Sequence, residues 1–178
     1  MAVGCGEGGS VVFDEVQMEG KRRVSAEETA VDVFRSLAGV GAELMVETLA
    51  GLTEGKLVGR KQDEAQATLA PILTREDGAI DFSRTARQIY DRWRGFQPWP
   101  GAHTRLREKK LIVHRMRVGT ESGTEAGVLR VLGNEMAVGC GGRGSVVFDE
   151  VQMEGKRRMS AAEFLRGFQV KSGERLGL

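Results

Sequence analysis

The stretches AHTRLREKKLIVHRMR at residues 102–117 and EMAVGCGGRGSVVFDEVQM at residues 135–153 determine how this chain is expected to fold. Both contain short apolar runs, rich in β-branched residues and separated by charged or glycine-bearing turns, which is typical of β-hairpins. The pattern predicts strands at residues 102–107, 110–117, 127–131, 135–140 and 145–153. Short strands at this spacing indicate a small closed or partly open β-barrel.

A long amphipathic helix is expected well before these strands. Ser25 and Glu28 have capping-box spacing, and apolar residues then recur at helical intervals up to Gly51. Two glycines fall inside this pattern, so we expect the helix to be interrupted or bent near Gly39 and Gly41.

Two shorter helices are expected on either side of the barrel. The stretch from Thr53 to Asp81 lacks periodicity and predicts an extended linker, after which a helix is expected from about Ser83 to Gly95. The rigid turn Pro98-Trp99-Pro100-Gly101 separates that helix from the first strand. After the last strand, Ser160 and Glu163 again have capping-box spacing and predict a short terminal helix.

The N-terminal segment is a near copy of a later one. Residues 1–28 match residues 136–163 at a constant offset of 135, and only positions 7, 8, 24 and 27 differ. The copy therefore predicts a second β-hairpin, and one site in a sheet cannot hold both. Four explanations are open: the N-terminal copy is disordered, it pads a sheet edge, it exchanges with its twin in another molecule, or it arose during sequence assembly.

Composition is that of an ordinary globular chain, with 40% apolar and 29% charged residues. No apolar run is long enough to span a membrane, and the first residues lack the features of a signal peptide, so no membrane partner and a cytoplasmic location are expected. The two cysteines, Cys5 and Cys140, have no neighbouring Cys or His at metal-ligand spacing, so no metal site is expected.

Charge is divided unevenly along the chain. Residues 1–83 carry 8 Lys and Arg against 15 Asp and Glu, a net charge of −7, whereas residues 84–178 carry 18 against 10, a net charge of +8. A basic second half suggests a polyanionic partner, and a merely solvated basic surface is the alternative. The candidate phosphate-binding residues are Arg92, Arg94, Arg105, Arg107, Lys109, Lys110, Arg115, Arg117, Lys156, Arg157 and Arg158.

Several motifs in this order resemble the methionyl-tRNA formyltransferase family. They are QDE at 62–64, ATLAP at 67–71, EDGAID at 76–81, RGFQPWPGA at 94–102 and GKRRMSA at 155–161. The sequence departs from the family pattern at Phe82, where tryptophan is common, and at Gly95, where alanine is more usual. The resemblance covers residues 28–178, and its most specific parts are the PWPGA turn and the QDE to EDG linker.

The resemblance implies an α+β, mainly β fold: a small OB-like Greek-key β-barrel preceded by two helices and an extended linker, and the repeat adds a duplicated hairpin at the N-terminus. Together the repeat and the resemblance predict four regions: the hairpin copy at 1–27, the last helix of the family's catalytic domain at 28–52, the linker at 53–82, and a helix with the barrel at 83–178. In the family this barrel contacts initiator tRNA.

The resemblance also implies that the family's formyl-transfer chemistry belongs to residues that this chain does not match. The family transfers a formyl group from 10-formyltetrahydrofolate to the amino group of methionyl-initiator tRNA, using an Asn, a His, an Asp and a serine-leucine-leucine-proline loop in a domain that these residues do not match. We therefore expect no catalytic residue and no bound cofactor in this chain, and a tRNA-binding part that is not active alone. Its two histidines, His103 and His114, fall in predicted strands, where a structural or RNA-contact role is more common than catalysis.

Two other interpretations remain. The chain is either a self-associating module in which the duplicated hairpin is exchanged between molecules of a homodimer, or the C-terminal domain of a formyltransferase that acts on sugar nucleotides. Trp99 is a candidate to stack on a base, although a packing role between helix and barrel is favoured. The glycine-rich segments 4–9 and 139–144 lie between strands, so hairpin turns are expected there and not phosphate loops.

Overall fold

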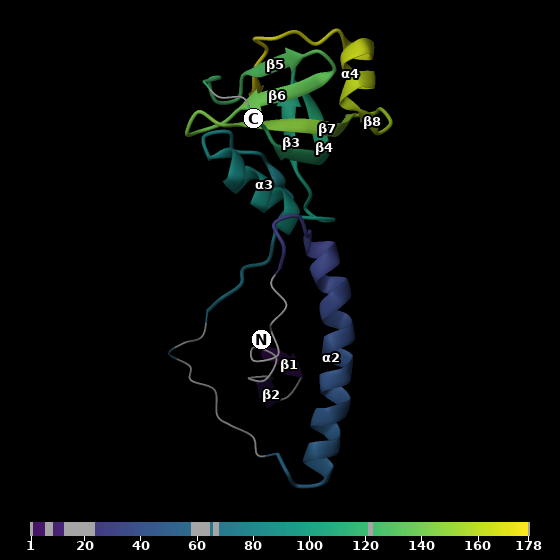
Figure 1. The fold of residues 1–178 in the computed structure, drawn as a ribbon. Coiled ribbons are helices and arrows are strands. Elements are labelled where there is room, and N and C mark those ends of the chain that lie inside the picture. The colour runs from purple at the N-terminus through teal and green to yellow at the C-terminus, as the bar shows by residue number, and fades with distance from the viewer. Residues whose placement is uncertain are drawn as a thin grey trace. The chain divides into compact units, whose positions relative to one another are not determined.

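The computed structural model describes residues 2–5, 9–12, 24–57, 65, 68–120 and 123–177, with only the backbone described at 2–5 and 9–12. The chain divides into two compact units, Met1–Ile72 and Leu73–Leu178 (Figure 1). In the described residues, no helix has the length and apolar character that a membrane span requires.

The first unit contains one long helix, α2 (Ala30–Thr53), and a two-stranded antiparallel sheet of β1 (Ala2–Cys5) and β2 (Gly9–Val12). Asp32 caps the N-terminus of this helix, because its carboxylate accepts hydrogen bonds from the Thr29 N–H at 3.0 Å and from the Thr29 hydroxyl at 2.7 Å. A glycine ends it: Gly55 adopts a φ of +69°, and its N–H donates to the Leu52 carbonyl at 3.1 Å.

Two details of this helix differ from the sequence-based prediction. The predicted box at Ser25 does form, since the Glu28 N–H donates to the Ser25 hydroxyl oxygen at 3.2 Å, but the helix begins only after a second box at Thr29. Of the predicted interruption or bend near Gly39 and Gly41, the interruption is wrong, because α2 is continuous from Ala30 to Thr53, and the bend stays a prediction. Two interior glycines lower helix stability by about 1 kcal/mol each without forcing a break.

The second unit is built on a seven-stranded antiparallel sheet (Figure 1). Its strands follow the spatial order β5-β6-β7-β4-β3-β9, and β8 pairs with β7. They are β3 (His103–Leu106), β4 (Lys109–Val118), β5 (Leu129–Leu132), β6 (Glu135–Gly139), β7 (Ser145–Met153), β8 (Met159–Ser160) and β9 (Leu176–Gly177).

The C-terminal segment joins the two edges of this sheet. On one side Leu106 of β3 pairs with Leu176 of β9. On the other side the Leu129 N–H donates to the Glu174 carbonyl, and the Leu176 N–H donates to the Gly127 carbonyl, both at 2.8 Å. The segment thus connects β3 with the beginning of β5 and completes a ring of strands.

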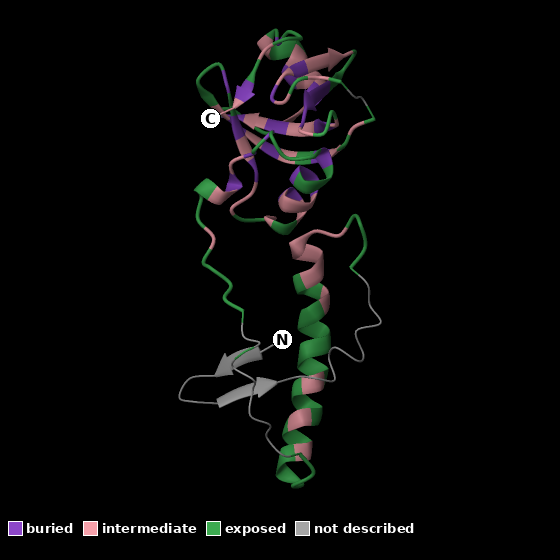
Figure 2. Cartoon of the chain, turned by 90° about the vertical axis from the view of Figure 1, so that its left-hand side faces the viewer, coloured by how far each residue is buried: buried purple, intermediate pink, exposed green. Residues whose placement is uncertain are grey.

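Helix α3 (Ala86–Gly95) and helix α4 (Ala161–Phe168) pack on this sheet, α3 against β4 and β7 and α4 against β6 and β7. The core contains Phe148 of β7 and Phe164 of α4, both with 0% exposure. Figure 2 shows the buried residues concentrated in the strands and in the inner faces of the two short helices. Alternating burial along β3 and β4 follows from the period of two residues in a strand.

The α+β, mainly β prediction is confirmed, and the five predicted strands correspond to β3 through β7 with small shifts at their ends. The terminal helix also begins as predicted: the Glu163 N–H donates to the Ser160 hydroxyl oxygen at 3.3 Å, and the Ser160 N–H donates to the Glu163 carboxylate at 3.0 Å. Three short elements were not predicted: β8, β9 and the 3-10 turn η2 (Glu76–Gly78).

Candidate nucleic-acid interface

The β3–β4 hairpin carries the most basic part of the sequence on its outer face. Arg105 and Lys110 are opposite each other in the antiparallel register, so their side chains share one face of the hairpin. Thr104 and Leu106, the neighbours of Arg105 along β3, are buried. Arg115 is exposed on β4 beside a register shift that a β-bulge or irregularity introduces between Val113 and Arg115.

Arg107, a predicted phosphate-binding residue, makes four hydrogen bonds within the protein. Its Nε and Nη2 atoms each bind the Glu174 carboxylate at 2.6 Å, and its Nη1 and Nη2 atoms donate to the carbonyls of Phe168 and Gln169. The hydrogen bond and charge of Glu174 raise the pKa of Arg107, while Arg107 is the main cause of the lowered pKa of Glu174. Arg107 therefore ties the hairpin turn to the C-terminal segment.

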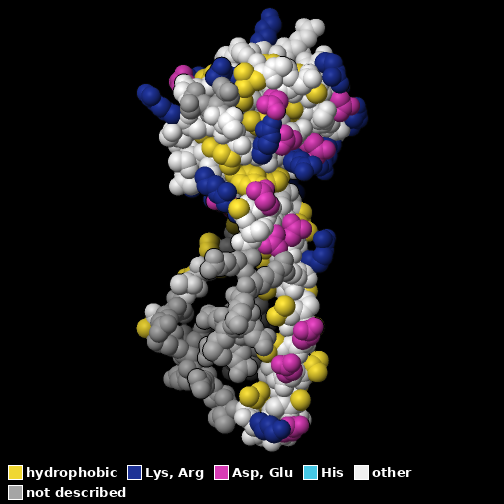
Figure 3. All heavy atoms as spheres, viewed as in Figure 1, with side chains coloured by type: hydrophobic (Ala, Val, Ile, Leu, Met, Phe, Trp, Pro, Cys, Tyr) yellow, Lys and Arg dark blue, Asp and Glu magenta, His cyan; other side chains and the backbone are white. Residues whose placement is uncertain are grey.

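Three more of the predicted residues are paired with carboxylates on the barrel surface. Arg117 binds Glu135, Arg157 binds Glu163 at 2.9 Å, and Arg158 binds Glu150. Figure 3 shows the same arrangement at larger scale, with Lys and Arg side chains interspersed among Asp and Glu on the face of the barrel in view. Such partners reduce the positive potential that a phosphate would meet.

The arginines of α3 are also paired. Arg94 binds Asp91 at 2.8 Å, and its side chain is only 14% exposed, so it contributes little to the surface. Arg92 lies 3.6 Å from the Asp77 carboxylate and donates to the Asp77 carbonyl at 3.1 Å. Its guanidinium carbon also lies 4.5 Å from the centre of the Phe96 ring, a cation–π contact.

Five of the predicted cations have no ion pair within the described part of the chain. They are Arg105, Lys109, Lys110, Arg115 and Lys156.

Four of these five cations, Arg105, Lys109, Lys110 and Lys156, lie at one end of the β3–β4–β7 sheet, and we call them the end cluster. Lys110 and Lys109 are opposite Arg105 and Leu106, respectively, in the register of the hairpin. The Glu154 N–H donates to the Lys110 carbonyl at 2.9 Å, and Lys156 lies in the turn that follows Glu154. The end cluster thus combines the tip of one hairpin with the turn after β7.

The two histidines of the barrel lie in different surroundings. Nε2 of His114 lies 2.9 Å from the Gln152 side-chain oxygen, and burial together with the charge of Lys110 lowers the pKa of His103. Among the described residues, no hydrogen bond joins either histidine to an aspartate.

Trp99 lies in the loop between α3 and β3 and is 52% exposed, so its side chain is only partly packed. The buried tryptophan is Trp93, which stacks on Tyr90 with ring centres 5.5 Å apart. The tryptophan at the interface of helix and barrel is therefore Trp93, and the packing role favoured for Trp99 is wrong.

A hollow that the sequence did not indicate lies beside α3, and we call it the α3 hollow. It has a volume of about 270 Å³ including its open mouth, and the side chains of Ile80, Ile89 and Trp93 line it. Arg84 and Arg92 are also at its wall. The Trp93 Nε1–H is buried and has no hydrogen-bond partner in the described part of the chain. No local pattern could have shown this, since an unsatisfied donor depends on how distant segments pack.

Comparison with known proteins gives a consistent family. Residues 72–169 match the family described as "Formyl transferase, C-terminal domain". The chain is 55% identical over 150 residues to a methionyl-tRNA formyltransferase of Acidobacterium capsulatum, which covers 84% of this chain and 48% of the relative. It is 41% identical over 163 residues to a methionyl-tRNA formyltransferase of Koribacter versatilis, and the match covers 92% of this chain and 52% of the relative.

Solved structures with the same fold are more distant in sequence. A variant of HypX from Aquifex aeolicus matches 85% of this chain and 28% of its own, with a TM-score of 0.60 and 16% identity. HypX in complex with tetrahydrofolic acid matches 73% of this chain and 24% of its own, with a TM-score of 0.51 and 19% identity. These likenesses support the fold alone.

The chain spans about half the length of the methionyl-tRNA formyltransferases that it matches. The barrel that carries the end cluster and the α3 hollow falls within the matched segment, residues 72–169, apart from its C-terminal strand. The family match covers more than half of the chain and agrees with the sequence relatives, and so this chain belongs to the formyl transferase C-terminal domain family.

Proposed function

We propose that this chain is the tRNA-binding part of a methionyl-tRNA formyltransferase, and that the end cluster contacts the RNA backbone. The observation that carries this proposal is the group of cations at one end of the sheet that have no acidic partner among the described residues. Phosphate contacts from Lys and Arg give affinity with little sequence discrimination. The partner that the relatives' name suggests is a tRNA, and within the proposal it is the initiator tRNA in the cytoplasm.

The proposal assigns no transfer step to this chain. In the parent reaction, 10-formyltetrahydrofolate supplies the formyl group and the amino group of methionyl-tRNA accepts it. The chain's own residues are proposed to bind and orient the RNA, and the part of the relatives' length that this chain does not span is proposed to perform the chemistry. HypX, which shares the fold, is known in complex with tetrahydrofolic acid, which is consistent with a folate-using parent.

A titration of tRNA with the full chain at several salt concentrations tests the proposal. One variant changes Arg105, Lys109 and Lys156 to glutamine, and a charge-matched control changes Arg117, Arg157 and Arg158, which are paired. We expect the first variant to lose more affinity and to lower the slope of log K against log salt by about 0.7–0.9 per lost phosphate contact. Absence of tRNA affinity at low salt, or an equal loss in both variants, would overturn it.

A second candidate function is self-association through the duplicated hairpin. Ala2 pairs with Val12 in the β1–β2 sheet, as Ala137 pairs with Val147 in β6–β7, so the two copies share one register. The buried residues of the second copy recur at every equivalent position of the first, so the first copy could take its place in another molecule. Light scattering that finds a monomer, with and without residues 1–23, would exclude this.

A further inference from the structure

The cations of the end cluster are carried by two different elements, the β3–β4 hairpin and the turn after β7. The hairpin carries three of them, and the turn carries Lys156. The turn runs from Met153 to Lys156, and the Lys156 N–H donates to the Met153 carbonyl at 2.9 Å. The two elements meet one RNA backbone with little loss of conformational entropy only if the turn is already held beside the hairpin.

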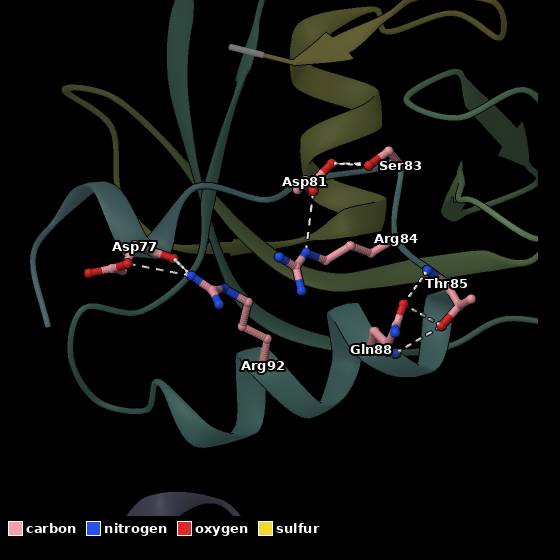
Figure 4. Close-up of polar contacts among 7 residues, drawn as sticks. All are labelled: Asp77, Asp81, Ser83, Arg84, Thr85, Gln88 and Arg92. Carbon is pink, nitrogen blue, oxygen red and sulfur yellow. Dashed lines mark hydrogen bonds and ion pairs between the residues drawn. The ribbon is translucent and has the colours of Figure 1, made fainter. Parts of the chain in front are cut away.

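The end cluster is held differently from the arginines near α3, which carboxylates hold. Figure 4 shows Arg84 bound to the Asp81 carboxylate at 3.3 Å. It also shows Arg92 beside the Asp77 carboxylate at 3.6 Å. The cations of the end cluster have no such ion pair among the described residues. Their arrangement therefore depends on the backbone that carries them and on the groups that hold this backbone.

The first half of the turn is attached to β4 by backbone and carboxylate bonds. The Glu154 N–H donates to the Lys110 carbonyl at 2.9 Å, and the Glu154 carboxylate accepts from the Lys110 N–H at 3.4 Å. Gly155 follows with a φ of +72°, which the third residue of a tight turn requires and which favours glycine. A second attachment is found at the other end of the turn, where Lys156 lies.

Gln152 makes this second attachment. Its side-chain Nε2–H donates to the Lys156 carbonyl at 2.9 Å, and its side-chain oxygen lies 2.9 Å from Nε2 of His114. Because an amide oxygen only accepts hydrogen bonds, His114 is the donor and carries a proton on Nε2. In the register of the sheet, Gln152 is opposite Ile112, two residues from Lys110. One neutral side chain thus connects the cation-bearing end of the turn with the middle of β4.

We propose that Gln152 is a positioning residue of the RNA interface. By holding the end of the turn beside β4, it lets Lys156 and the cations of the hairpin bind one RNA backbone together. Without this amide the lysine must be ordered when the RNA binds, and that ordering lowers the affinity. The inference rests on the proposed RNA-binding function and adds a neutral residue that no charge pattern in the sequence indicates.

Double-mutant cycles in the full chain test the coupling between Gln152 and Lys156. Gln152→Met keeps the length of the side chain and removes both hydrogen bonds, and its effect on tRNA affinity is measured in wild type, beside Lys156→Gln and beside Arg105→Gln. We expect a loss of about threefold to tenfold in wild type and beside Arg105→Gln, the contribution of about one hydrogen bond. Beside Lys156→Gln we expect almost no loss, because the charge to be positioned is gone.

Amide hydrogen exchange gives a second readout that needs no RNA. In Gln152→Met we expect the Lys156 N–H to exchange several-fold faster, because the turn has lost one of its attachments. The Val113 N–H is the control, since it lies on β4 and donates to the Ala102 carbonyl at 2.9 Å, so its exchange is expected to stay unchanged. Unchanged exchange at Lys156, or equally faster exchange at both amides, would overturn the inference.

The two proposals fail in different ways. If the chain binds tRNA and Gln152→Met costs the same affinity in every background, Gln152 supports the fold without positioning Lys156, and the end cluster stands. Full affinity of Gln152→Met in the wild-type background would also overturn the inference and leave the end cluster in place. If the chain has no affinity for tRNA at low salt, the RNA-binding function fails, and the positioning role fails with it.

Discussion

Glu163 shows how a single exposed side chain can be fixed by several contacts. Its carboxylate accepts from Arg157 at 2.9 Å and from the N–H and hydroxyl of Ser160, both at 3.0 Å. The bond to Arg157 is the largest cause that lowers its pKa from 4.5 to about 2, followed by the bonds to Ser160. The charged form is therefore favoured in the folded protein, and the first turn of α4 depends on it.

This shift predicts a pH dependence of stability. Because the folded pKa lies below the unfolded one, the contribution of Glu163 is present above pH 4.5 and is lost as the pH falls towards 2. The neutral variant Glu163→Gln keeps the shape of the cap. We expect wild type to exceed it in urea midpoint at pH 7 and the gap to shrink between pH 4.5 and 2.5. A gap of equal size at pH 7 and pH 2.5 would contradict this.

The sequence identified the basic residues of the barrel, but it could not show which of them are engaged in ion pairs. Arg107 and Arg105 look alike in the sequence, and both were candidates for phosphate binding. In the structure Arg107 meets Glu174 from a distant part of the chain, whereas Arg105 has no ion pair among the described residues. Pairing depends on which segments the fold brings together, so charge alone could not separate the two arginines.

The glycines of α2 have opposite effects at the C-terminal end of the helix and in its interior. Gly55 has a φ of +69°, and the Lys56 N–H donates to the Gly51 carbonyl at 2.9 Å, which completes a Schellman motif. Gly39 and Gly41, in contrast, lie within the helix and have no atom within 4 Å of an added Cβ. The same residue type stabilises the helix end and weakens its interior.

This contrast gives a prediction for α2. Gly39→Ala and Gly41→Ala are each expected to stabilise the helix by about 0.5–1 kcal/mol, because alanine loses less conformational freedom than glycine on entering a helix. Gly55→Ala is the matched control and is expected to weaken the helix, since alanine is strained at a positive φ. Far-ultraviolet circular dichroism during heating measures both. Stabilisation by all three changes would contradict the prediction.

Elements with a clear local pattern were predicted, and those without one were missed. The strands β3 to β7 alternate or contain β-branched runs, and α3 and α4 have recognisable boundaries. β8 and β9 have two residues each, too short for any periodicity to register. β9 is a strand only because β3 presents an unpaired edge to it, and that edge exists only in the folded sheet.

The whole barrel depends on this short final strand. The segment from Gly173 to Leu176 has hydrogen bonds or pairing with both β3 and the start of β5, two strands that are otherwise at opposite edges of the sheet. The Arg107 side chain holds the same segment through Glu174. The hairpin that carries the end cluster is thus anchored by the closure of the ring, and the position of its cations is coupled to the integrity of the C-terminus.

A change at Leu176 tests this coupling at the scale of the molecule. Leu176 is 5% exposed, so Leu176→Ala is expected to lower the free energy of unfolding by about 2–5 kcal/mol. Arg175→Ala is the control, since Arg175 is exposed and its ion pair with Glu125 lies on the surface. Because one segment joins both edges, hydrogen exchange should accelerate together at the amides of Leu106 and Leu129. Loss of protection at only one of the two would mean that the edges are held independently and that the ring is not a single cooperative unit.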